Sequence, residues 1–380
     1  MNTKKLAVLG ASVVGVGAAA VGAYRATHPS DARGPGTVDP GRGRPKIDDR
    51  LFGLPTDVVH HEVPTPDGGL LHVIEKGTGR PLVLVHGITL RCDVWAPQFH
   101  QLTDRFRVIA VDLRGHGASK AGRDGYGMPR LAADLATLLE DLDLRDAIVV
   151  GHSMGGMAVM RFCGDFPDVL AERVAGLVFV ATRAHQVMPP YIDRVARLLV
   201  GRGQGRVDSG RGLPTRMGVS TRIVRAGFGD RPSPVAVRLV AEMGQSMAPE
   251  ALVPSLAGLL DHDARVALRA TRTPSLVIVG TRDLITPVPA ARHLADLLPD
   301  TDFVVLRRAG HQLMQERPDE LAELLDAFAA RIAGTASTLA EAVAADPGPV
   351  SGGQVQHTPS RHRCGGTVVQ GSAGSGVCCT

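Results

Sequence analysis

The chain has 380 residues, of which 44% are hydrophobic, 21% charged and 3% aromatic. This is too much apolar material for a chain disordered throughout, and the composition excludes collagens, coiled coils and polytopic membrane proteins. Lysine and arginine exceed aspartate and glutamate by four, and residues 1–50 hold that whole excess. With a neutral body, one Trp and three Tyr, the chain lacks the basic face and stacking aromatics of a nucleic-acid-binding protein.

The N-terminal segment predicts targeting or anchoring. A basic opening precedes the uncharged residues 6–24, and a Pro/Gly/Arg-rich stretch follows. An uncharged run of this length spans about 28 Å as a helix, close to a bilayer core, whereas the small residues at 18–20 also suit signal cleavage. We expect a signal-anchor or signal peptide over 1–25 and a linker over 26–57, hence a membrane-anchored or exported protein.

The body of the chain, about 58–333, alternates short β-branched runs with amphipathic helical stretches. This is the pattern of a parallel sheet covered by helices on both faces. Ligands of such sheets bind beyond the carboxyl ends of the strands, so functional residues are expected directly after each run. The predicted strands are 81–86, 108–112, 147–151, 174–181, 275–280 and 303–306.

The strand at 147–151 continues into the sequence GHSMGG at 151–156 and then into an apolar helical stretch. A Gly-x-Ser-x-Gly sequence between a strand and a helix is the setting of a nucleophile on a sharp turn. The helix N-terminus also favours negative charge that develops there. The sequence therefore predicts Ser153 as the nucleophile. The other predicted residues of this elbow are Gly151, His152 and Gly155.

A serine hydroxyl needs a base to take its proton and a carboxylate to orient that base. Asp283 follows the predicted strand at 275–280, and His311 follows the one at 303–306. Both lie at the same sheet edge as Ser153, in the order Ser, Asp, His. We predict His311 as the base and Asp283 as its partner. Nearby acids that stay open as alternatives are Asp261, Asp263 and Asp300.

Two backbone N–H groups are predicted to bind the oxyanion of the reaction intermediate. One belongs to Met154, directly after the nucleophile, and the other to Ile88, in the loop after the strand at 81–86. Gly87 allows that loop to turn. We expect His86 to order the loop rather than to act as a base.

Between 181 and 275 the strand alternation stops, and we expect a helical lid over about 184–270. The first predicted apolar face comprises Tyr191, Val195, Leu198 and Leu199. A second helix, opening at Ser233-Pro234, has the apolar positions Val237, Val240, Met243 and Met247. Such a lid suits hydrophobic substrates, and the same residues are equally suited to packing lid helices together.

The C-terminal residues 334–380 are rich in Ala, Gly, Ser, Thr and Pro, and we expect a flexible low-complexity tail. Two of the five cysteines, Cys92 and Cys163, lie in the body. The other three, all in the tail, are Cys364, Cys378 and Cys379. The spacing of the five cysteines does not resemble a zinc site.

Five motifs occur in one order along about 58–333. They are HG at 86–87, DLRGHGAS at 112–119, GHSMGG at 151–156, GTRD at 280–283 and GH at 310–311. Together they resemble the α/β-hydrolase superfamily, specifically a lidded, esterase- or lipase-like member with a serine nucleophile. The resemblance implies an eight-stranded, mostly parallel sheet flanked by helices, a helical lid after the sixth strand, and no metal or organic cofactor.

Several reactions use this fold. Ser153 argues against the dehalogenases and epoxide hydrolases of the superfamily, whose nucleophile is Asp. Cofactor-free perhydrolases usually carry a Pro in the oxyanion loop, where this sequence has Ile88-Thr89; they stay open as an alternative, as do carbon–carbon bond hydrolases. Hydrolysis of a hydrophobic or lipid-like ester is the most economical prediction. A hydrophobic-ligand-binding protein without activity is the non-enzyme alternative, which loss of the triad would have signalled.

Overall fold

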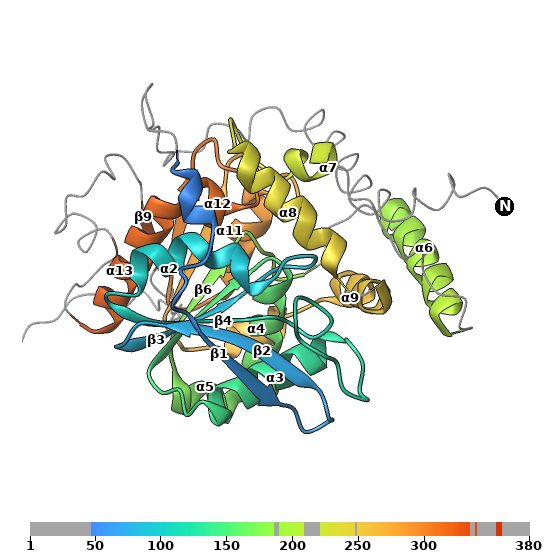
Figure 1. The fold of residues 1–380 in the computed structure, drawn as a ribbon, viewed down its shortest axis with the longest axis horizontal. Coiled ribbons are helices and arrows are strands. Elements are labelled where there is room, and N and C mark those ends of the chain that lie inside the picture. The colour runs from blue at the N-terminus through green and yellow to red at the C-terminus, as the bar shows by residue number, and fades with distance from the viewer. Residues whose placement is uncertain are drawn as a thin grey trace, which may run out of the picture.

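The computed structural model describes residues 47–185, 190–208, 221–247, 249–334, 339 and 355–358. They form a central sheet with helices on both faces (Figure 1). The predicted signal-anchor or signal peptide at 1–25 lies outside the described residues and stays a prediction. Within the described part, no helix is both long and apolar enough to span a membrane.

The described residues contain nine strands, which lie side by side in the order β1-β2-β4-β3-β5-β6-β7-β8-β9. Their bounds are β1 Val59–Pro64, β2 Leu70–Lys76, β3 Arg80–Val85, β4 Phe106–Val111, β5 Ala147–His152, β6 Val174–Val180, β7 Ser275–Gly280, β8 Thr301–Leu306 and β9 Val355–Thr358. Strands β3 to β8 run parallel, whereas β2 is antiparallel to β1 and β4. The eight-stranded, mostly parallel sheet is therefore confirmed as β1 to β8.

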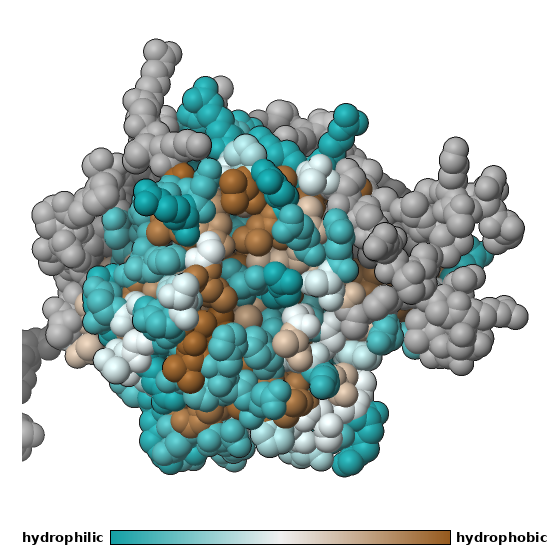
Figure 2. All heavy atoms as spheres, viewed as in Figure 1, coloured by the Kyte–Doolittle hydropathy of each residue, from teal (hydrophilic) through white to brown (hydrophobic). Residues whose placement is uncertain are grey.

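Helices and short 3-10 turns connect these strands. Their bounds are η2 Asp49–Phe52, η3 Cys92–Trp95, α2 Ala96–Leu102, α3 Met128–Asp141, α4 Met154–Asp165, α5 Pro167–Arg173, α6 Pro190–Asp208, α7 Thr221–Ala226, α8 Pro234–Ser246, α9 Pro249–Asp261, α10 Arg265–Ala270, α11 Val288–Leu297, α12 Leu313–Glu316 and α13 Pro318–Ile332. On the face seen in Figure 2, hydrophobic residues are interspersed with hydrophilic ones, as is usual for protein surfaces.

Alternation along the buried strands divides the core into two layers. In β3, Val83 and Val85 belong to the layer that contains α3 and α4. Leu82 and Leu84 point the other way, into the layer that contains α2, α8 and α13. Because successive strand side chains face opposite sides, a run that is apolar at every position requires cover on both faces. The sheet is therefore covered on both faces. The loops that hold the predicted site residues follow the carboxyl ends of its strands.

Helices α6 to α10 lie between β6 and β7, in the range where the sequence predicts a helical insertion. Helix α8 begins as predicted, because the Ser233 Oγ accepts a hydrogen bond from the Val235 N–H at 3.1 Å. Its predicted apolar side chains are buried, and those of Val237, Val240 and Met243 join the core layer of α2 and α13.

The predicted apolar face of α6 is not the face through which this helix packs. Val195 and Leu198 are 48% and 53% exposed, and α6 instead packs against α9 through Ala196 and Val200. Residues four apart share one side of a helix, and a small residue such as Ala196 lets two helices approach closely. Hydrophobic periodicity favours the face with the larger side chains, Val195 and Leu198. In the structure, the face with Ala196 makes the contact instead. The side chain of Tyr191 is outside those described.

Strand β9 lies within 334–380, where the sequence analysis predicts no strand. It pairs antiparallel with β8, which is otherwise the edge of the sheet. An edge strand presents unpaired backbone N–H and C=O groups that accept almost any extended segment. The pairing needs no apolar alternation, so the polar sequence of β9 gives no signal of it.

Candidate active site

Ser153 sits on a strained turn between β5 and α4. Its φ of 52° and ψ of −116° are a combination that side-chain-bearing residues rarely adopt. Two hydrogen bonds hold it: the Ser153 N–H donates to the Val180 carbonyl oxygen at 3.1 Å, and the Thr182 Oγ1 donates to the Ser153 carbonyl oxygen at 2.8 Å. The turn predicted from the sequence is thus present, with neighbouring β6 fixing its shape.

Close approach of three segments explains the glycines of the elbow. A Cβ on Gly155 would collide with the carbonyl oxygens of Val85 and His86, and one on Gly151 would meet the Gly156 Cα at 2.5 Å. Only glycine lets β3, β5 and the first turn of α4 come this close. Since the first N–H groups of a helix have no acceptor within it, that of Met154, the first residue of α4, is available to a ligand.

Asp283 and His311 meet at the same edge of the sheet. The His311 Nδ1 lies 2.9 Å from the Asp283 Oδ2, and both side chains are buried. The Asp283 carboxylate also accepts from the Ile285 and Thr286 N–H groups, each at 2.8 Å, and from the Thr286 Oγ1 at 2.7 Å. With its Nδ1–H donated to Asp283, a neutral His311 presents Nε2 as a proton acceptor.

His152 brings the base to the elbow. Its ring centroid lies 4.8 Å from that of His311, and its Nε2 donates to the His311 carbonyl oxygen at 2.9 Å. Burial, and secondly the repulsion that a protonated His311 would exert, hold the pKa of His152 well below its usual value. His152 is therefore neutral and positions the loop of His311 beside Ser153.

Glu316 is a residue that the sequence analysis misses. Its buried carboxylate accepts hydrogen bonds from the backbone N–H groups on both sides of His311, those of Gly310 and Gln312, and from Gly229 in the insertion at 2.6 Å. The His311 N–H donates to the Gly227 carbonyl oxygen at 2.7 Å. The loop of His311 is thus tied to the segment before α8. An acid on a short helix five residues after the histidine carries no distinctive sequence signal.

His86 makes hydrogen bonds to the loop of Ile88 and to the chain after β4. Its Nε2 accepts from the Leu113 N–H at 3.0 Å, so its Nδ1 carries the proton and donates to the Gly87 carbonyl oxygen at 2.7 Å. In a trans peptide unit the C=O and N–H point in opposite directions. Fixing the Gly87 carbonyl oxygen therefore fixes the direction of the Ile88 N–H, the second predicted donor. Burial lowers the pKa of His86, which keeps this arrangement neutral.

Within the described residues, one group of side chains brings several metal-binding atoms together. His72, Cys92 and Asp112 each offer an atom within 4.8 Å of the others. The Asp112 carboxylate, however, accepts from the His72 Nδ1 and from the N–H groups of Cys92 and Ala118. Burial raises the pKa of the Cys92 thiol well above its usual value, which disfavours the thiolate that a metal requires. We therefore interpret this group as a set of hydrogen bonds that holds the loops together, not as a metal site.

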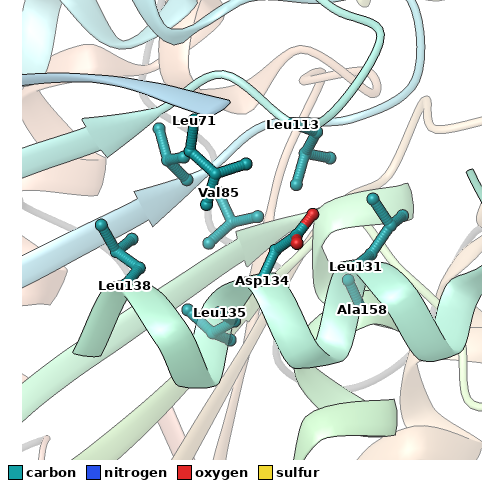
Figure 3. A pocket seen from close by; sticks show the side chains of 9 residues that line it. Leu71, Val85, Leu113, Leu131, Asp134, Leu135, Leu138 and Ala158 are labelled. Carbon is teal, nitrogen blue, oxygen red and sulfur yellow. The ribbon is translucent and has the colours of Figure 1, made fainter. Parts of the chain in front are cut away.

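A hollow beneath α3 is separate from the site (Figure 3). Eight apolar side chains and Asp134 line it: Leu71, Val85, Val111, Leu113, Leu131, Leu135, Leu138 and Ala158 complete the wall. The Asp134 carboxylate already accepts from the Arg114 Nε at 2.6 Å. Its lining belongs to the core layer of α3 and α4, so we interpret it as a packing gap.

Comparison with known proteins gives consistent matches. The family model described as "alpha/beta hydrolase fold" matches residues 80–318. The 2-(acetamidomethylene)succinate hydrolase of Mesorhizobium japonicum is 30% identical, over 66% of this chain and 87% of its own. The pimeloyl-[acyl-carrier protein] methyl ester esterase of Chromobacterium violaceum is 32% identical, over 63% and 91%. A malate-bound thermophilic esterase from Thermogutta terrifontis is similar in structure, with a TM-score of 0.62, 28% identity, and coverage of 72% and 99%.

Proposed function

Because the chain belongs to the α/β-hydrolase family and is an enzyme of that class, we propose that it hydrolyses carboxylic esters through an acyl-enzyme on Ser153. The observation that carries this proposal is the buried Asp283–His311 pair beside the strained Ser153 elbow. A base oriented by a carboxylate next to a serine on a sharp turn is the arrangement that activates a serine hydroxyl. The ester-cleaving relative from Chromobacterium violaceum supports the same reaction class.

Each proposed step uses one of these groups. The Ser153 Oγ attacks the ester carbonyl carbon while the His311 Nε2 takes the hydroxyl proton. The N–H groups of Met154 and Ile88 stabilise the oxyanion. His311 then gives its proton to the leaving alcohol, and the acyl-enzyme forms. A water molecule, deprotonated by His311, attacks the acyl-enzyme, and collapse of that intermediate returns the proton to Ser153 and releases the acid.

The side chain of Ile88 connects the oxyanion loop to the helical insertion. It packs both on the core layer of α4 and on a small apolar cluster of Met247, Ala251 and Leu252. Ile88 follows Gly87, whose backbone lies against the Ser153 side chain, so Ile88 joins this cluster to the elbow. We therefore propose that the insertion acts as a lid and that the ester has a hydrophobic portion.

Hydrolysis of a p-nitrophenyl ester series of increasing acyl length tests this proposal. We expect turnover by the full chain, with an optimum length that measures the space beneath the insertion. The Ser153→Ala variant should lose at least a thousandfold, on the order of the loss expected without the nucleophile. Equal turnover by the variant would contradict the proposal. Turnover confined to peracid formation or to a carbon–carbon substrate would favour the alternative reactions on the same triad.

A further inference from the structure

Arg183 lies where the chain leaves β6 and enters the helical insertion, close to the proposed nucleophile Ser153. It follows Thr182, whose Oγ1 donates to the Ser153 carbonyl oxygen. It precedes Ala184, whose carbonyl oxygen accepts from the Ala264 N–H at 2.8 Å. Thr182 and Ala184 are both buried. The backbone on either side of Arg183 is therefore fixed, and its side chain leaves the chain just beyond the carboxyl end of β6, next to the elbow.

The side chain of Arg183 is half-buried beside the elbow. Its Nε is shielded from solvent and has no hydrogen-bond partner. Burial lowers the pKa of Arg183 to about 10, and the charge of Asp283 acts in the opposite direction. That carboxylate already accepts from His311 and from Thr286. The negative charge of Asp283 therefore attracts Arg183. The oxygens of this carboxylate, however, already accept hydrogen bonds from residues of the proposed site.

A fully buried arginine shows how this fold holds such a charge. Arg114 is 1% exposed and is bracketed by two carboxylates, with its Nη1 2.9 Å from the Asp67 Oδ2 and its Nε 2.6 Å from the Asp134 Oδ2. A buried guanidinium N–H without such a partner is unfavourable in the free protein. An unpaired one beside a catalytic centre is therefore a candidate for ligand binding.

His262 lies against the same residue. Burial, and secondly the charge of Arg183, lower the pKa of His262 to about 4, and its Nε2 is buried without a hydrogen-bond partner. An anion beside Arg183 would offset that charge and favour a proton on the His262 Nε2. The imidazole would then become a second donor to the same anion.

We propose that Arg183 binds a carboxylate of the substrate, so that the enzyme acts on esters that carry a second, ionised acid group. This inference rests on the proposed ester hydrolysis and specifies its substrate class. A guanidinium donates two parallel hydrogen bonds to a carboxylate, which fixes both the position and the orientation of the bound acid. The ester group at Ser153 and the anion at Arg183 then define the two ends of the substrate.

Matched substrate pairs test the proposal. The anionic series consists of the monomethyl esters of succinate, glutarate and adipate. Each neutral counterpart has an isopropyl group in place of the carboxylate, so size and shape are conserved. We expect the wild-type full chain to favour one of the anionic esters in kcat/KM. In Arg183→Gln that preference should fall about tenfold to a hundredfold, the effect of a hydrogen bond to a charged group, while the neutral esters change little.

A control variant separates local binding from general charge effects. Arg265 also lies at the base of the insertion, but it is exposed and paired with Asp263 at 2.6 Å. Arg265→Gln removes the same charge and should leave the anionic preference unchanged. Equal losses on both ester series in Arg183→Gln would overturn the proposal and assign Arg183 to positioning Asp283. A wild type that favours the neutral esters, with Ser153-dependent turnover, would overturn it while ester hydrolysis stands.

Binding of the dicarboxylic acids themselves gives a measurement that does not depend on turnover. Calorimetric titration of Ser153→Ala with succinate, glutarate and adipate should show binding of at least one acid. Adding Arg183→Gln to Ser153→Ala should weaken that binding about tenfold or more. Absence of binding by all three acids, or binding unaffected by Arg183→Gln, would contradict the proposal even if no ester were found to be hydrolysed.

Discussion

The loops at the carboxyl edge of the sheet and the helix α6 of the insertion are held in opposite ways. Each residue of the proposed triad at the sheet edge has several hydrogen bonds that fix its position, and the surrounding side chains are buried. Helix α6 is held to α9 by a small apolar cluster of Ala196, Val200, Val253 and Leu260. Elements with few buried contacts open at lower free energy than the core does. The residues proposed to be catalytic therefore lie where the fold is rigid, and the proposed lid includes the helix that should open most easily.

The helices of the insertion also differ in how firmly buried contacts hold them. Helix α8 contributes Val237, Val240 and Met243 to a core layer that includes the sheet, whereas α6 contributes none of its described side chains to that layer. In Figure 1, α8 crosses the body of the molecule and α6 lies at its periphery. We expect α6 to move without disturbing the triad, and α8 to move only with loss of the fold.

The largest expected effect is at the rigid edge. Asp283→Asn keeps the size of the side chain but can favour the wrong tautomer of His311, and kcat should fall on the order of ten thousandfold. The measurement is steady-state turnover of the preferred ester, with circular dichroism to show an intact fold. Asp261→Asn, on α9, is the matched control and should retain activity. Comparable losses in both variants would show that the sheet edge has no special role.

The rigid edge should also be sensitive to acid. Burial, and secondly the repulsion that a protonated His86 would exert, lower the pKa of His116 to about 3. Because this folded-state pKa lies below the ordinary value of about 6.5, stability is full above pH 6.5 and falls as the pH drops towards 3. Between pH 6.5 and pH 5, protonation of His116 in the unfolded state should lower the free energy of unfolding by about 2 kcal/mol.

Denaturant unfolding at pH 7 and pH 5 measures this loss. His116→Gln removes the titrating group, and its stability should change less between the two pH values than that of the wild type. An equal dependence on pH in both proteins would contradict burial of a neutral His116 as the cause.

Glu316→Gln tests the link between the His311 loop and the insertion. The amide keeps one acceptor oxygen and directs its NH2 group at backbone donors, so a buried N–H should lose its partner. We expect a loss of about 1 to 3 kcal/mol in unfolding free energy together with a lower kcat. Unchanged turnover with reduced stability would show that the clip supports the fold alone and does not position His311.

The smallest expected effects compare the two parts of the insertion directly. Val240→Ala in α8 should lower the global free energy of unfolding by about 1 to 3 kcal/mol. Val200→Ala in α6 should leave the global value nearly unchanged and instead speed hydrogen exchange across α6 and α9. Denaturant unfolding and hydrogen exchange, measured on both variants, distinguish the two. A global loss in Val200→Ala equal to that in Val240→Ala would show that the insertion is one cooperative unit.

How much the sequence predicts depends on the kind of signal. The strands and the Ser153 elbow are predictable because buried parallel strands are apolar at every position and the glycines are required by close approach. The packing face of α6 is not predictable in this way, because hydrophobic periodicity does not decide between a face of large side chains and a face of small ones. The Glu316 clip and the Arg183 environment depend on residues far apart in the sequence. Their burial and pairing emerge only when the loops are brought together.

The most direct measurement is the covalent labelling of the folded full chain by a fluorophosphonate, followed by peptide mass analysis. Such a reagent phosphonylates a serine whose hydroxyl a neighbouring base has activated, with loss of fluoride. We predict one label per chain, on Ser153, and slower labelling in Asp283→Asn. A folded protein that is not labelled, or is labelled equally well when Ser153 is replaced by Ala, would contradict the activation of Ser153 by His311 and Asp283.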